Sequence, residues 1–402
     1  MNNIYKVWYY AFSNFFLLLL VNQLFEYINI DLYLHQILML LCVLTGFICA
    51  FKNAHFKTVD MVMFIYVGYI IINALFSSYI NQTELVRRAM IIQTFPIFCY
   101  FIGRNTNFDI KQIILTTKYP LLFSCLAGLY FYFSEPAWYY AMKSAAITEY
   151  TSDTQLMEIF RLSSFWPHPY QIGYGTILFY FVWLYEMVVS KGLKWNIINL
   201  SILFILVTVL LLAQLRVCIL FAIIASIMCY VVKGITFKNI FKISILAILI
   251  AVLSFLLVSK LDNTTSEYIS THISSLFEED AIQERIQHTS GEIEYSLFGD
   301  GFGRYDYAAR KYNMSSLIDN EYANQISELG YIGFSLLLFI LLITILAGLK
   351  IYRKKLVEYI IILFFVVSMA GASVLSNHHQ YNFIFWFALG SFWRYYYNPS
   401  NS

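Results

Sequence analysis

The stretch LLLAQLRVCILFAIIA, residues 210–225, is apolar at nearly every position and carries one guanidinium, that of Arg216. A membrane-spanning helix needs about 20 consecutive apolar residues, so this stretch predicts the end of one span, a turn at Arg216 and the start of the next span. The whole chain has the same character, because 60% of its 402 residues are hydrophobic and only 12% are charged. An ordinary soluble domain is about one quarter charged. The sequence therefore predicts an integral membrane protein.

Hydropathy predicts an all-α polytopic fold, a single integral membrane domain over residues 1–402 with about twelve spans. The expected spans are residues 7–25, 32–51, 59–80, 88–103, 113–133, 170–189, 195–213, 217–232, 240–260, 326–349, 356–374 and 380–397. The first apolar run is followed by Glu26 and not by a small-residue cleavage site. We therefore expect this run to be a span and not a cleaved signal peptide.

Basic residues predict the orientation of the spans. Lys and Arg collect in alternate short loops, for example at Lys52, Arg104 and Lys233. Cytoplasmic loops carry such an excess, so we expect both termini in the cytoplasm. The same alternation places two long segments, 134–169 and 261–325, on the outer face. The second contains helical periodicity around 276–286, which predicts a surface helix, and then the glycine-rich FGDGFGRY, which predicts a flexible turn.

The six cysteines lie inside apolar runs and lack the spacing of zinc ligands. We expect them to pack within the helical bundle, with no disulfide framework and no metal.

Two arginines are the strongest candidates for a functional site. Arg216 lies at the turn described above, and Arg161 lies in FRLSSFWPHPYQIGYG, just before the sixth expected span. Long cations near helix ends also anchor a protein by reaching lipid headgroups, and this is the alternative role for both. Arginine, however, keeps its charge when desolvated and presents a planar fork of donors that matches phosphate oxygens. We therefore favour binding of a lipid diphosphate.

The outer loops supply weaker candidates. Two prolines flank His168 and predict a fixed, non-helical turn, in which a structural histidine is the more frequent outcome. Arg285 belongs to the amphipathic segment next to the bundle. Arg304 follows GDGFG, where glycines permit close approach to a ligand, although a plain turn is the alternative. Arg310 and Lys311 are expected to be solvated.

The entry to the tenth expected span carries the candidate base, Asp319. Its carboxylate could equally be the N-cap of that helix. Asp319, Tyr322 and Ile326 share one helical face, and Gly330 and Gly333 lie further along, where small residues allow close helix contact.

Three further ionisable groups carry less weight as candidates. Glu328 lies about two and a half turns deeper than Asp319 and would need a polar partner. His378 and His379 are expected in a solvated outer turn.

Three stretches resemble the bacterial O-antigen and capsular polysaccharide polymerases, the Wzy family, and the related O-antigen ligases. FRLSSFWPHPYQIG resembles the family's Arg-x-x-Gly-x-x-x-x-Pro-Asn entry to a span, and LAQLRVCILFAII resembles its Ser-Arg-Gly turn. LFGDGFGRY with IDNEYANQISELGYIGF resembles its Gly-x-Gly and Asn-x-Tyr region. The similarity covers the second half of the chain by motif and the first half by hydropathy only.

The sequence departs from the family pattern at three places. Ser164 stands where glycine is common, and His168 and Pro169 either replace the Pro-Asn pair or shift it by one residue. Ligases usually carry histidine before the asparagine, whereas this chain has Asp319 before Asn320. The last departure favours a polymerase.

The resemblance implies a GT-C-like, metal-independent glycosyltransferase with no cofactor, acting on undecaprenyl-diphosphate-linked glycan at the outer face of the bacterial cytoplasmic membrane. It implies catalytic roles for Asp319, Arg216 and Arg161. The implied substrate contacts are Arg285, Arg304, His168, Asn320 and Tyr322. Trp166 and Tyr170 are candidates for stacking on sugars. The implied partners are the lipid-linked glycan, membrane lipid, a chain-length regulator and a flippase, and no nucleic acid.

Two alternatives remain open from the sequence. An O-antigen ligase would move finished glycan to another acceptor. A polysaccharide transporter or flippase would carry polar residues deep in several spans, where this sequence offers Lys118, Glu186 and Glu328.

Overall fold

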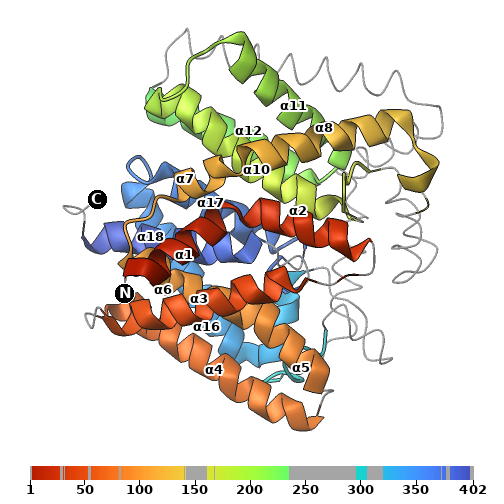
Figure 1. Cartoon of the computed structure of the whole chain (residues 1–402). Helices are drawn as coiled ribbons and strands as arrows, with labels where there is room; N and C mark the ends of the chain where they lie inside the picture. The colour runs from red at the N-terminus through yellow and green to blue at the C-terminus, as the bar shows by residue number, and fades with distance from the viewer. Residues whose placement is uncertain are drawn as a thin grey trace, which may run out of the picture. The chain divides into compact units, whose positions relative to one another are not determined.

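The structure is a computed structural model of the chain, and the helices of its described part are drawn in Figure 1. It describes residues 2–27, 30, 32–52, 56–80, 83–139, 141, 161–166, 168–234, 296–305, 320–372, 374–376 and 381–398. All regular secondary structure in these residues is helical, with no strand. This confirms the all-α expectation.

The described residues contain six helices long and apolar enough to cross a membrane, and two bent helix pairs raise this number to eight. The helices at Ile197–Ala213 and Leu356–Ser368 are apolar but shorter. The expected span 240–260 lies outside the described residues. The helices therefore indicate a multi-pass membrane protein, and the number of twelve spans stays a prediction.

The chain divides into two compact units. Unit 1 comprises Met1–Phe12, Tyr33–Gln112 and Glu284–Ser402, and unit 2 comprises Ser13–Leu32 and Ile113–Gln283.

Unit 2 is built around one helix, α10. Its helices are α2 (Phe15–Glu26), α8 (Lys118–Ser134), α10 (Pro169–Tyr185) with the π-helical turn η4 (Glu186–Ser190), α11 (Ile197–Ala213) and α12 (Arg216–Lys233). Every residue of α10 from Ile172 to Leu184 is buried, and α8, α11 and α12 all pack against it (Figure 1). A helix that is apolar on all sides belongs in such a central position.

Unit 1 is built around α18 (Asn382–Tyr397) in the same way, with residues 382–393 all buried. Its other helices are α1 (Asn2–Ser13), α3 (Leu34–Lys52), α4 (Thr58–Ile80), α5 (Thr83–Ala89), η1 (Met90–Thr94), η2 (Phe95–Phe98), α6 (Cys99–Asn105), α16 (Glu321–Ile351) and α17 (Leu356–Ser368). The short helix α7 (Ile110–Thr116) leads from unit 1 into unit 2.

Two glycines allow a close contact between α6 and α18 in unit 1. A Cβ on Gly390 would lie 2.0 Å from the Tyr100 carbonyl oxygen, and one on Gly103 would lie 2.3 Å from the Phe387 carbonyl oxygen. Small residues on both sides let two membrane helices approach this closely.

The outward face of α4 is apolar, as a lipid environment requires. Ile65, Ile72 and Phe76 are exposed, whereas Met63 and Tyr66 on the other face are buried. A helix that buries a tyrosine and exposes isoleucine and phenylalanine reverses the pattern of a soluble protein, which supports a multi-pass membrane fold.

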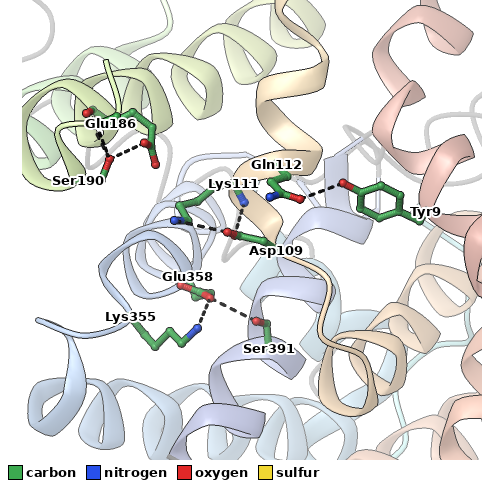
Figure 2. Close-up of polar contacts among 10 residues, drawn as sticks. Tyr9, Asp109, Lys111, Gln112, Glu186, Ser190, Lys355, Glu358 and Ser391 are labelled. Atoms are coloured by element: carbon green, nitrogen blue, oxygen red, sulfur yellow. Dashed lines mark hydrogen bonds and ion pairs between the residues drawn. The ribbon is translucent and has the colours of Figure 1, made fainter. Parts of the chain in front are cut away.

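An ion pair and hydrogen bonds join neighbouring helices within unit 1. Lys355 Nζ lies 3.3 Å from Glu358 Oε1, and the Ser391 hydroxyl donates to the same oxygen at 3.3 Å, which ties α17 to α18 (Figure 2). Tyr9 Oη donates to Gln112 Oε1 at 3.2 Å (Figure 2). These contacts connect α17 to α18 and α1 to α7.

The long helix α16 is broken at Gly330, which has φ 67° and ψ −174°. Only glycine adopts this backbone without strain. The sequence led us to expect that Gly330 and Gly333 both allow a close helix contact. This is confirmed for Gly333, whose added Cβ would lie 2.8 Å from Tyr69 Cε1 of α4, whereas Gly330 interrupts the helix instead. A break of this kind leaves carbonyl oxygens without their intrahelical donors, and other groups must satisfy them.

Candidate functional site

The turn at Arg216 forms as the sequence predicted, between two helices of unit 2. Helix α11 ends at Ala213, Gln214 adopts the left-handed conformation with φ 54° and ψ 32°, and α12 begins at Arg216. The side chain of Arg216 is partly exposed. Arg216 is thus the first residue of α12 and lies directly after the turn.

The segment that carries Arg161 lies against this turn. The Leu162 amide donates to the Leu212 carbonyl at 2.9 Å, four residues before Arg216. Helix α10 packs there as well, because a Cβ on Gly173 would lie 2.1 Å from Leu215 Cδ1. Arg161 and Arg216, which are 55 positions apart in the sequence, therefore belong to neighbouring turns at one end of unit 2, and both are partly exposed. We call these two turns the arginine end.

The segment 161–166 is held rigidly. Ser164 has φ 57°, and its hydroxyl donates to the Ser124 carbonyl at 2.6 Å. Ser164 thus has a backbone conformation that favours glycine, and its hydroxyl makes a hydrogen bond there. The expectation that Trp166 stacks on a sugar was wrong, because its ring is 1% exposed and packs edge-on against Phe16.

His168 ends this segment as the N-cap of α10, with φ −113° and ψ 147°, and Pro169 is the first helical residue. The fixed, non-helical entry predicted from the sequence is confirmed. Proline is favoured at the first position of a helix, because an N–H group at that position would have no acceptor within the helix and its absence costs no hydrogen bond. His168 is partly exposed, and Tyr170 follows it one residue into the helix.

Gln214 is a polar residue of the arginine end that the sequence analysis missed. Its side chain is 8% exposed, and neither its amide nitrogen nor its amide oxygen has a hydrogen-bond partner among the described residues. A buried amide needs partners, and this one lies two residues from Arg216. The sequence analysis placed Gln214 in the turn between two expected spans without giving it a role, and its burial and left-handed conformation now distinguish it.

The second candidate region, in unit 1, is the glycine-rich loop 296–305. The Asp300 amide donates to the Ser327 carbonyl at 2.7 Å, and the Tyr331 amide donates to the Ser296 carbonyl at 3.1 Å. The loop therefore supplies partners to backbone groups at the break in α16. The expectation of a flexible turn was wrong, because these bonds and the burial of Phe302, 0% exposed, hold the loop in place.

The side chains of this loop are also fixed. Tyr305 Oη donates to Asp300 Oδ2 at 2.9 Å. Burial first, and then this hydrogen bond, raise the pKa of the Tyr305 phenol, so it stays a neutral donor. Arg304 is partly exposed, and its Nε is buried without a hydrogen-bond partner in the described part of the chain.

The loop and the broken helix meet at two glycines. A Cβ on Gly299, which has φ 80°, would lie 2.3 Å from the Glu328 carbonyl oxygen, and one on Gly330 would lie 2.4 Å from the Gly299 nitrogen. One glycine of each motif, Gly299 of FGDGFG and Gly330 of GYIG, thus takes part in the same close backbone contact.

We expect Gly299→Ala to lower the free energy of unfolding by on the order of 3 kcal/mol, because the methyl group adds a steric clash to an unfavourable φ. The melting temperature of the purified protein in detergent measures this. Gly68→Ala is the matched control, since its Cβ would have no neighbour within 4 Å. Equal melting temperatures for the two variants would contradict the close contact.

Asn320 and Tyr322, expected to contact substrate, have structural partners at the start of α16. Asn320 is the N-cap, with Oδ1 accepting from the Ala323 amide at 3.2 Å and Nδ2 donating to the Ala370 carbonyl at 3.1 Å. Tyr322 Oη donates to the Val366 carbonyl at 2.6 Å. Both side chains thus have structural partners, and the capping role that the sequence left open for Asp319 belongs to Asn320.

Two buried carboxylates follow on α16. Glu328 accepts from Gln93 Nε2 at 3.3 Å and from the Tyr305 amide at 3.0 Å, which confirms that this acid has polar partners. Glu321, missed from the sequence, accepts from Gln325 Nε2 at 2.8 Å, from the Leu375 and Ser376 amides at 2.9 and 3.1 Å, and from the Ser376 hydroxyl at 3.0 Å.

The other predicted residues lie outside the described part of the chain. These are Asp319, Arg285, Arg310, Lys311, His378, His379 and the expected surface helix. Lys118 lies at the start of α8, with Nζ 5.0 Å from the centre of the Trp183 ring. Glu186 accepts from Ser190 at the end of α10 (Figure 2).

Neither the family models nor the curated proteins with which the sequence was compared give a match.

Proposed function

We propose that this protein is a polysaccharide polymerase, a glycosyltransferase that joins undecaprenyl-diphosphate-linked repeat units at the outer face of the bacterial cytoplasmic membrane. The observation that carries the proposal is the arginine end, where the bond from the Leu162 amide to the Leu212 carbonyl brings the turns of Arg161 and Arg216 together. The resemblance of three stretches to the polymerase family supports it.

The proposed glycosyl transfer needs positively charged side chains held in place beside the leaving group. The leaving group is a dianionic diphosphate whose charge grows as the glycosidic bond breaks, so arginines beside it stabilise the transition state more than the ground state. In the proposal Arg161 and Arg216 hold the diphosphate, assisted by Arg285. The acceptor hydroxyl attacks the anomeric carbon of the donor glycan, Asp319 takes the hydroxyl proton, and undecaprenyl diphosphate leaves. Arginine forks take the place that a metal has in other transferases.

Gln214 and His168 complete the proposed site. Both lie at the arginine end, and the buried amide of Gln214 offers a donor and an acceptor to a glycan or phosphate oxygen. Arg304 of unit 1 is assigned to substrate binding on the resemblance.

The test is polymerisation by the purified protein. We expect a lipid-linked repeat unit to be lengthened in the presence of EDTA, with release of undecaprenyl diphosphate. Failure to elongate the repeat unit in any buffer, with folded protein, would contradict the proposal. Transfer of preformed glycan to a different acceptor, without elongation, would identify the ligase alternative.

One observation favours a second candidate, a transporter of lipid-linked glycan. Such a protein is expected to bury polar groups inside its spans, and unit 1 buries Glu321, Glu328 and Gln93. Translocation of a labelled lipid-linked unit across vesicles, with no elongation, would support this candidate over the polymerase.

A further inference from the structure

Three cations of unit 1, Lys57, Arg104 and Arg394, lie close together, and we call them the basic end. They come from the residue before α4, the last turn of α6 and the last turn of α18. The ring of Tyr397 contacts two of them, because Lys57 Nζ and Arg104 Cζ lie 6.0 and 5.1 Å from its centre. The start of one helix and the ends of two others therefore meet at this ring.

Arg394 lies beside Arg104. The backbone nitrogen of Arg104 would lie 2.8 Å from a Cβ on Gly390, which is one turn before Arg394 on α18. Arg394 and Tyr397 are three positions apart on the same helix, so they share one face. The charge of Arg104 acts on the Arg394 guanidinium. Two guanidinium groups and one ammonium group thus gather around the end of α18.

The carboxylate of Asp60 is in direct contact with this group. Asp60 Oδ1 lies 3.2 Å from Arg104 Nε and also accepts from Tyr100 Oη at 2.6 Å. Asp60 Oδ2 accepts from the Lys57 backbone amide at 2.9 Å. Both carboxylate oxygens are therefore used, and they balance one of the three positive charges.

Two further acids, Glu358 and Asp109, act on Arg394, and each has a cation of its own. Lys355 Nζ lies 3.3 Å from Glu358 Oε1 (Figure 2). Lys111 Nζ lies 3.4 Å from Asp109 Oδ2 (Figure 2). Within the part of the chain that the structure describes, the Arg394 guanidinium makes no ion pair, and its Nη1 has no hydrogen-bond acceptor. Five cations thus face three carboxylates, which leaves an excess of two positive charges.

This excess charge favours a bound anion. Removing a charge from water costs free energy unless an opposite charge balances it, and Arg104 is only 8% exposed. Asp60 occupies Nε of Arg104, and the two terminal NH₂ groups of this side chain make no ion pair with any described residue. Guanidinium forks match the oxygens of a phosphate group. The basic end therefore suits one phosphate-type anion.

The surroundings of the basic end are typical of a membrane interface. Tyrosines 395–397 follow Arg394, and tyrosine is enriched where a bilayer meets water. The exposed apolar face of α4 begins one turn beyond Lys57 with Met61, 55% exposed, and continues with Ile65, 57% exposed. A lipid acyl chain fits along this face while its headgroup phosphate contacts the cations, whereas a soluble phosphate gains nothing from the apolar face.

We propose that the basic end binds the headgroup phosphate of an anionic phospholipid through Lys57, Arg104 and Arg394. The alternation of basic residues in the sequence predicts the cytoplasmic leaflet for this end, and basic pockets between helices on that side are suited to anionic headgroups. The alternative role of the two arginines is structural, because cations in the last turn of a helix stabilise it. The site does not depend on the proposed polymerase activity.

The test is the melting temperature of the purified full-length protein in detergent with added phosphatidylglycerol or, separately, phosphatidylcholine. A ligand that binds only the folded state raises the melting temperature, and we expect phosphatidylglycerol to raise it by on the order of 5 °C over phosphatidylcholine. Arg394→Gln should remove most of this difference. Lys57→Gln, at an exposed position, provides a second variant if Arg394→Gln does not fold.

The matched control is Arg353→Gln, since Arg353 is an exposed arginine of the same unit and its Nε donates to Tyr352 Oη. It should keep the full difference between the two lipids. An equal loss in Arg353→Gln and Arg394→Gln would show only a general attraction between basic surface and anionic lipid, and would overturn the site. A purely structural role predicts that Arg394→Gln lowers the melting temperature in both lipids and leaves their difference unchanged, which also overturns it.

Inorganic phosphate added without lipid separates the two sources of a phosphate group. We expect it to leave the melting temperature unchanged. A rise as large as that with phosphatidylglycerol, lost in Arg394→Gln, would overturn the assignment to a lipid.

Discussion

Arg216→Lys should reduce polymer formation at least about 100-fold, an effect as large as that of Arg216→Ala. Lysine keeps the positive charge but has no planar fork, so it cannot hold two phosphate oxygens at once. The turn itself should survive, because its left-handed residue is Gln214 and its packing uses Leu215. The measurement is polymer length and amount on gels from cells that carry equal amounts of membrane-inserted protein.

Arg87→Lys is the control for the Arg216 substitution. Arg87 is an exposed arginine of α5, away from both candidate regions in the sequence. It should leave the polymer unchanged. Full-length polymer from the Arg216→Lys protein would refute the bidentate role and leave Arg216 as a headgroup anchor.

Asp319→Asn should abolish polymer formation while the protein still inserts and folds. The substitution keeps the size of the side chain and removes the carboxylate proposed to take the acceptor proton, a contribution of about 10²–10⁴-fold for a general base. Loss of helix capping would not explain such an effect, because the N-cap of α16 is Asn320, whose Oδ1 accepts from the Ala323 amide.

Asn320→Asp is the companion variant. Aspartate retains the oxygen that accepts from the Ala323 amide but loses the donor to the Ala370 carbonyl, so the melting temperature should fall by a few degrees, about the effect of one exposed hydrogen bond. In contrast, Asp319→Asn should change activity alone. Unchanged polymer in the Asp319→Asn protein would remove Asp319 from the mechanism.

Much of the helical framework could be predicted from hydropathy. The turn at Arg216 and the proline-led entry at Pro169 lie where the sequence places them, because both depend on local chemistry. The start of α16 was placed five residues late, since Glu321, Asn324, Gln325 and Glu328 look polar in a hydropathy plot although all four are buried.

Hydropathy could not predict which faces of helices far apart in the sequence pack against each other. Gly103 and Gly390 are ordinary residues in two separate apolar runs, and only the fold shows that they face each other's helices. The same holds for Gln93 and Glu328, which are 235 positions apart. A polar residue inside a span needs a partner, and hydropathy alone does not identify that partner.

The two glycine motifs could be found in the sequence, but their joint role could not be predicted from it. Their spacing in the sequence suggested one flexible turn and one helix contact, and each interpretation considered the motif alone. In the structure Gly299 and Gly330 serve the same contact, because the break in α16 needs a second backbone to satisfy its carbonyl and amide groups.

The most direct test of the central claim is the affinity of the purified protein for undecaprenyl diphosphate, measured for the wild type, Arg161→Lys, Arg216→Lys and the double variant. If both arginines hold the same diphosphate, each single variant should weaken binding, and the double variant should deviate from the product of the two single effects. Binding that is equal in all four proteins, or effects of the two substitutions that multiply independently, would contradict a shared diphosphate site.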